Sequence, residues 1–200
     1  MKLRCALLSL AMVGAAAAQS SSLPIGLVSG AGQYIWVPAP TAASSVGFFF
    51  DVTVANTLTF QGVSFPSYTP LDQAMTLEMW VTNSGITTYV GSETNQANWT
   101  QRATGASTIV GAPATNYVCL GSGVTLNPGT YGVVFIVHNA NNLFSNLGPQ
   151  TFSNADMTVN VGAVSAATFS TAPSAYGTNT FYFNGALHYS LGAITSSCAS

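Results

Sequence analysis

Charged side chains are nearly absent from this sequence. They make up 4% of its 200 residues, against about 25% in a typical soluble domain. Beyond the first few residues the only lysine or arginine is Arg102. The chain therefore lacks the positive charge that neutralises nucleic-acid phosphates or docks a protein on anionic lipid. Disorder is not expected either, because 11% of the residues are aromatic and disordered chains are poor in aromatics.

Motifs for serine hydrolysis and for metal binding are also missing. The segment GLVSG at 26–30 places its serine one position too late for the Gly-x-Ser-x-Gly pattern of serine hydrolases. His138 and His188 show no paired spacing with each other or with the cysteines, as zinc would require. Neither SET (92–94) nor SNAD (153–156) resembles a calcium loop. We expect no metal, and a serine triad assembled only in space stays open.

Acidic residues are too few and too scattered to predict a glycosidase. Such enzymes need two carboxylates that face each other across the substrate. The five acids are Asp51, Asp72, Glu78, Glu93 and Asp156. Their separation in sequence indicates solvated or turn-capping roles, although a pair formed across strands stays open. We therefore expect neither an enzyme nor a cofactor.

The N-terminus is typical of an export signal. Lys2 and Arg4 precede an apolar run at 6–18, and the alanines at 16–18 supply the small residues that signal peptidase recognises before Gln19. A membrane anchor is the alternative, but a run of 13 residues is shorter than the roughly 20 that cross a bilayer. We expect residues 1–18 to be a cleaved signal peptide, with no membrane insertion afterwards, and the protein to be secreted or held at the cell surface.

Cysteine is scarce, and only three are present. Removal of the signal peptide would take Cys5 and leave Cys119 and Cys198. Two cysteines in an oxidising compartment can pair, and this bridge would attach the C-terminal tail to the body of the domain. Two free thiols are the alternative.

Short β-branched and aromatic runs between turn residues predict strands throughout the mature chain. Such runs lie at 46–55, 57–65, 75–83, 86–91, 107–110, 116–120, 124–126, 130–139, 156–162 and 181–190. Apolar side chains alternate in most of them, whereas 130–139 is apolar on both faces and is expected to be central. This pattern predicts an all-β protein of about nine strands. The expected fold is a single antiparallel β-sandwich with jelly-roll-like or Greek-key connectivity.

Local signals refine this expectation. The alternation changes phase at Gly62, which predicts a β-bulge. The turn at 83–85 predicts a hairpin over 75–91, followed by a loop at 91–105. In the final strand, Gly185 interrupts the apolar face, which predicts a bulge or a large neighbouring ring over it. His188 falls on the other, mixed face, and an outward strand position explains it without a functional role.

The sandwich is expected to span residues 46–192. Residues 19–45 form an N-terminal segment in which Tyr34–Trp36 is expected to be an edge strand. Residues 193–200 form the C-terminal tail.

Six segments together resemble a group of secreted bacterial β-sandwich domains found in planctomycete-like genomes. They are FFFDVTVANTLTFQGVSF, TLEMWVTN, ANWTQ, LNPGTYGVVF, SNADMTVNVG and FNGALHYS. The resemblance covers about residues 46–190. It implies a β-sandwich outside the cytoplasm and implies no reaction. Such domains often carry a sorting or anchoring segment after the sandwich, and TSSCAS at 195–200 does not resemble one.

Large aromatic residues give the best lead to a ligand. Trp80 shares a strand face with Glu78, Tyr89 lies on the expected partner strand, and Trp99 lies in the loop that follows. Exposed rings beside neutral polar groups would suit sugar stacking. The alternative is that all three rings fill or cover the core, as large aromatics usually do.

These observations favour a non-catalytic secreted module with a structural, adhesive or extracellular-matrix role, in which copies of the chain self-associate. The alternative is a carbohydrate-binding module that holds a glycan on Trp80, Tyr89 and Trp99. A hydrolase of unknown type is a second alternative.

Overall fold

The computed structural model describes residues 20–25, 34–36, 45–67, 74–108, 114–139, 143–145, 150–165, 169 and 183–192. Within these ranges the chain is all-β, apart from the 3-10 turn η1 (Gln96–Asn98). The strands are β1 (Ser20–Ile25), β2 (Tyr34–Trp36), β3 (Ser45–Val54), β4 (Leu58–Ser67), β5 (Ala74–Thr82), β6 (Trp99–Thr108), β7 (Ala114–Leu126), β8 (Gly129–His138), β9 (Leu143–Ser145), β10 (Thr151–Ser153), β11 (Met157–Ser165) and β12 (Gly185–Leu191). The expected signal peptide, the C-terminal tail and Asp72 lie outside the described residues.

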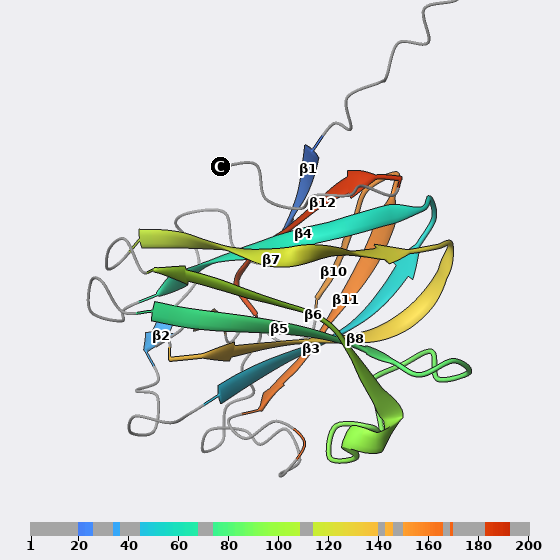
Figure 1. Ribbon diagram of the computed structural model, residues 1–200, viewed down its shortest axis with the longest axis horizontal. Coiled ribbons are helices and arrows are strands. Elements are labelled where there is room, and N and C mark those ends of the chain that lie inside the picture. Colours follow the sequence, from blue (N-terminus) through green and yellow to red (C-terminus); the bar gives the residue numbers. More distant parts are fainter. Residues whose placement is uncertain are drawn as a thin grey trace, which may run out of the picture.

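Ten of these strands form one antiparallel sheet, in the order β1-β12-β4-β7-β6-β5-β8-β3-β11-β10. The sheet is strongly curled, and Figure 1 shows β4, β7 and β12 in the upper part of the view and β3, β5 and β8 in the lower part. The turn from one part to the other lies between β6 and β7, which are joined by the single registered pair Gly105–Leu120. A Cβ at Gly105 would collide with the carbonyl oxygen of Cys119, so a glycine is needed where these two strands cross closely.

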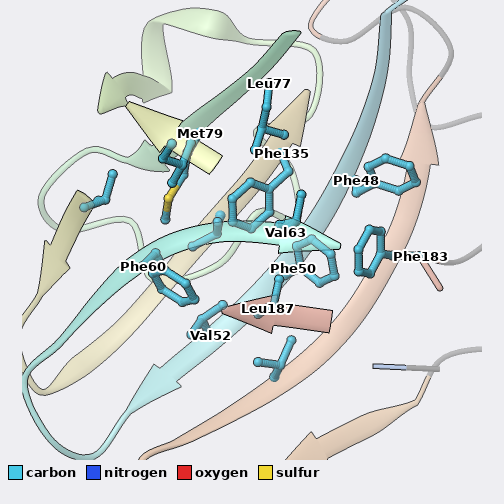
Figure 2. Packing of buried hydrophobic residues seen from close by; sticks show 14 of the residues in the cluster. Phe48, Phe50, Val52, Phe60, Val63, Leu77, Met79, Phe135, Phe183 and Leu187 are labelled. Atoms are coloured by element: carbon cyan, nitrogen blue, oxygen red, sulfur yellow. The ribbon is translucent and has the colours of Figure 1, made fainter. Parts of the chain in front are cut away.

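The main hydrophobic core lies inside the curl. Alternate residues of β3, β5, β8 and β11 point inward from one half of the sheet, and alternate residues of β4, β7 and β12 meet them from the other. Phe60 on β4 lies 6.3 Å from Phe135 on β8, and Phe183 lies 5.5 Å from Phe50 on β3, as ring-centroid distances. Figure 2 shows these rings packed between the strands. Each buried phenylalanine contributes about 1.5–3 kcal/mol, so this contact holds the curl closed.

Several strand predictions are confirmed. β3 and β8 match the runs at 46–55 and 130–139, and β8 lies between β3 and β5 with Val133 to Val137 buried. Of the apolar face predicted for the run at 181–190, Leu187 and Tyr189 on β12 and Phe183 just before it are at most 2% exposed, whereas Phe181 lies outside the described residues.

Both glycine predictions also hold. The register shifts between Phe60 and Gly62 as a bulge requires. A Cβ at Gly185 would lie 2.7 Å from the ring of Phe183, so a large ring does lie over this glycine.

The predicted hairpin over 75–91 is wrong. β5 pairs with β6 and β8, and residues 83–98 contain no strand. The turn forms as expected, with Gly85 at φ +89°, but the chain then leaves the sheet. The backbone N–H of Tyr89 and the hydroxyl of Thr88 both donate to the carboxylate of Asp51, at 2.9 Å each. These bonds draw the segment across the outer side of β3. The edge of β5 is then free to pair with β6.

The expected loops also contain strands. β6 occupies much of the 91–105 region, and the two runs at 116–120 and 124–126 belong to the single strand β7. Tyr34–Trp36 does form a strand, but β2 pairs with β9 in a separate two-stranded sheet instead of extending the main one.

No helix in the described ranges is long and apolar enough to span a membrane.

Candidate functional site

A second, smaller apolar cluster lies on the outer side of β3, β5, β6 and β8, away from the main core. We call it the outer aromatic cluster. Its buried members are Phe49, Trp99, Val134 and Ile136, and Trp80, Tyr89 and Phe169 pack against them while partly exposed. The three aromatic residues singled out in the sequence therefore belong to one cluster. They meet because β5, β6 and the 83–98 segment all reach the same face.

Trp99 is part of the packing of this cluster and is only 5% exposed. Its ring lies 5.8 Å from that of Phe49 and 5.8 Å from that of Phe169. The indole N–H donates to the carbonyl oxygen of Ser92 at 2.8 Å. A stacking platform requires an exposed ring, so the exposure expected of Trp99 in the sugar-binding alternative is wrong. A buried indole with a satisfied N–H anchors the 83–98 segment instead.

Trp80 is half-buried and its position is fixed by a carboxylate. The indole N–H donates to Oε2 of Glu78 at 2.7 Å, and the ring lies edge-on to Phe169 at 5.3 Å. The second oxygen of Glu78 lies 2.9 Å from Nε2 of His138 on β8. Glu78 thus joins an indole and an imidazole on two adjacent strands, with its side chain 25% exposed.

The pairing of Glu78 with His138 was not predicted from the sequence. Both residues occupy the outward phase of their strands, and Glu78 lies opposite Ile136 in the β5–β8 register. The phase was visible in the sequence, but the register between β5 and β8 was not. Knowing only the phase, one could not place His138 within reach of Glu78.

Tyr89 covers the backbone of β8 and β11, the two strands that pair with β3. Its ring lies 5.7 Å from that of Phe49 and sits where a Cβ at Gly162 on β11 would be, 2.5 Å from its Cζ. Its backbone N–H is 2.7 Å from the Cβ position of Gly132 on β8. Two glycines therefore make room for this segment, and its contact with the sheet is close along its length.

Three of the four acidic residues in the described ranges hold parts of the fold together. Asp51 binds Thr88 and Tyr89, and Glu78 binds Trp80 and His138. Asp156 accepts a hydrogen bond from the hydroxyl of Tyr189 at 2.8 Å. No group of three or more His, Cys, Asp or Glu side chains within these ranges is arranged to hold a metal ion.

His188 lies on the outer side of the other half of the sheet. Its Nε2 is 2.9 Å from Oγ of Ser64 on β4, and its ring meets that of Tyr117 on β7 edge-on at 4.8 Å. Burial lowers the pKa of the imidazole. On the same side, Cys119 is disulfide-bonded. Its partner lies outside the described residues, as Cys198 does, so the pairing of these two cysteines stays a prediction.

The chain matches no protein-family model and no curated protein sequence.

Proposed function

We propose that the chain is a non-catalytic secreted module with a structural, adhesive or extracellular-matrix role. The observation that carries this proposal is the use of the carboxylates. Asp51 fixes the 83–98 segment, Glu78 fixes Trp80 and His138, and Asp156 joins β12 to the β10–β11 turn. In a hydrolase that uses acids, such groups would be directed at a substrate, whereas here each is directed at the protein.

Neutral side-chain hydrogen bonds between strands support the same proposal. Hydroxyls of Thr53 and Thr130 are 3.2 Å apart, and Thr151 donates to the amide oxygen of Asn160 at 2.7 Å. Both pairs are exposed. A surface of this kind carries donors and acceptors without charge, and it suits close packing against a neutral polymer or another copy of the chain.

We further propose that the curled sheet is a β-sandwich whose two layers are β12-β4-β7 and β6-β5-β8-β3-β11. The single registered pair between β6 and β7 and the core packed between the halves support two layers. The disulfide at Cys119 supports an oxidising compartment, as the signal-like N-terminus and the resemblance to secreted bacterial domains do.

Light scattering on the mature protein tests the structural role. We expect oligomers whose population grows with protein concentration. Because the surface is nearly uncharged, the association should be insensitive to molar salt, whereas assembly through ion pairs would weaken. A monomer at every concentration, with no binding to matrix polysaccharide or protein, would contradict the proposal.

A carbohydrate-binding role is the second candidate, and one observation favours it. Trp80 is partly exposed and stands beside Glu78 and His138, which are 25% and 33% exposed and can bond a sugar hydroxyl. Tyr89 is the other partly exposed ring of the original three, whereas the buried Trp99 would only support them.

Affinity electrophoresis in soluble polysaccharide separates the two candidates. If the cluster binds glycans, Trp80→Ala should lose the retardation while the fold stays intact. The matched control is Tyr117→Ala, which removes a ring that is 42% exposed on the other half of the sheet. Equal retardation of the two variants and the wild type would rule out the outer aromatic cluster as the sugar site.

A further inference from the structure

A serine and a histidine are hydrogen-bonded on the outer side of β4 and β12, far from the outer aromatic cluster in sheet order. Oγ of Ser64 lies 2.9 Å from Nε2 of His188. In the strand register His188 stands opposite Gly62, and Ser64 stands opposite Ala186. The two side chains therefore meet on the diagonal between neighbouring strands.

Gly62 provides the space for this arrangement. The bulge at this position shifts the register of β4 against β12 between His188 and Tyr189. A Cβ at Gly62 would collide with the carbonyl oxygen of Val118 and would lie 3.0 Å from the ring of Tyr117. With glycine there, the Tyr117 ring lies over the backbone and packs edge-on against the imidazole.

The environment keeps the imidazole able to accept a proton. Burial lowers the pKa of His188, so the ring favours its neutral form more than a free imidazole does. A histidine nitrogen within hydrogen-bond distance of a serine hydroxyl is the contact between base and nucleophile through which serine nucleophiles are activated.

Access to the serine is restricted but not closed. Ser64 is 8% exposed, whereas the neighbouring Tyr117 is 42% exposed. The tyrosine ring therefore forms the solvent-facing side of the site, and a small reagent would approach along it. This geometry suits a compact acyl donor better than a polymer.

We propose that Ser64 is a nucleophile activated by His188 and that the pair takes an acyl group from a small activated ester. As Ser64 Oγ bonds to the carbonyl carbon, its proton passes to Nε2 of His188. The carbon–oxygen bond to the alcohol then breaks, and the alcohol leaves with the proton from Nε2. Attack by water on the acyl-serine, assisted by the same imidazole, releases the acid and restores the serine. This activity departs from the non-catalytic role proposed above: if Ser64 is acylated and turns over, the structural module also carries an esterase site, and if it is not, the structural role stands unchanged.

Covalent labelling of the wild-type mature protein tests the proposal directly. The probe is a small alkyl fluorophosphonate, with p-nitrophenyl acetate as the acyl donor in parallel. We expect one adduct per chain, mapped to Ser64 by peptide mass spectrometry. An adduct at another residue, or no adduct after prolonged exposure to millimolar probe, would overturn the proposal.

Two variants distinguish an activated serine from one that is merely accessible. Since glutamine can still bond to Ser64 but cannot act as its base, His188→Gln should slow labelling by about 100-fold. The matched control is Ser190→Ala on the same β12 strand, since Ser190 is fully buried and its Oγ bonds to no group in the described ranges. The Ser190→Ala variant should be labelled at Ser64 at the wild-type rate. Labelling of Ser64 at an unchanged rate in His188→Gln would also overturn the proposal, and if that variant fails to fold, the wild-type mapping decides alone.

Discussion

The hydroxyl of Tyr189 donates a hydrogen bond to Oδ2 of Asp156 at 2.8 Å, and this bond joins the two ends of the curled sheet. Tyr189 lies on β12, next to the last strand at one end of the sheet order, and Asp156 directly precedes β11, next to the last strand at the other end. Asn154 completes the link, since its side-chain amide donates to the same hydroxyl at 2.6 Å. The core keeps the sheet curled, and this polar link fixes where its ends meet.

Tyr189→Phe should destabilise the fold by about 1.5–3 kcal/mol, the usual contribution of a hydrogen bond to a charged group. The ring would remain in the core, so the change isolates the hydroxyl. Urea unfolding of the variant and the wild type measures the effect. The matched control is Tyr131→Phe, whose hydroxyl bonds to the carbonyl oxygen of Asn127 in an exposed turn. A loss no larger than that of the control would mean that the link between the sheet ends contributes little.

Gly132→Ala should displace the 83–98 segment from the outer face. The new Cβ would lie 2.7 Å from the backbone nitrogen of Tyr89 and 2.6 Å from a methyl group of Thr82. Such overpacking costs about 1–3 kcal/mol, and it should shift tryptophan fluorescence to the red by uncovering Trp99. Gly121→Ala is the control, because its nearest neighbour would be 3.3 Å away. An unshifted spectrum with unchanged stability would show that the segment is not held as tightly as its contacts indicate.

Strands whose side chains alternate were predictable from the sequence because alternation is a local property. β3 and β12 are examples, with inward residues that are buried as the pattern requires. β6 was not predictable, since its sequence WTQRATGAST is mostly polar and resembles a loop. It becomes a strand because β5 offers a free edge. That edge is free because Asp51, which is distant in sequence, binds Tyr89 and holds the 86–91 segment, the predicted partner of β5, away from the sheet.

The aromatic cluster was predictable in part for the same reason. The face of Trp80 followed from its phase in the strand, whereas the burial of Trp99 depends on Ser92, Phe49 and Phe169 around it. Pairs such as Ser64 with His188 depend on strand order and on the register shift near Gly62. A single sequence does not reveal which strands become neighbours. Neither the Ser64–His188 pair nor the Glu78–His138 pair could therefore be derived from it.

Acrylamide quenching should distinguish the tryptophans of the outer face. Trp99 is 5% exposed and should be protected, whereas Trp80 is partly exposed and should be quenched more strongly. Comparing Trp80→Phe and Trp99→Phe with the wild type assigns the signals. Strong quenching that disappears in Trp99→Phe would contradict the packing described for this ring.

Non-reducing peptide mapping should find Cys119 linked to Cys198. The cysteines are 79 positions apart, and a bridge over a loop of this length stabilises the folded state by about 4 kcal/mol in the chain-entropy model. Reduction should lower the unfolding midpoint accordingly. A peptide linking Cys119 to Cys5 would instead show that the N-terminal segment had been retained.

Stability should fall as the pH drops below neutral, and His188 should account for part of the fall. Burial lowers its folded-state pKa below the usual value of 6.5, so between the two values the unfolded chain binds the proton more readily than the folded one. The stabilisation is therefore complete above about pH 6.5 and is lost progressively as the pH falls toward the folded-state pKa. Because the imidazole is partly exposed, solvent screening keeps the effect modest. Urea midpoints of the wild type and His188→Gln, measured from neutral to mildly acidic pH, should converge as the pH falls. Parallel curves for the two proteins would show that this histidine is not responsible.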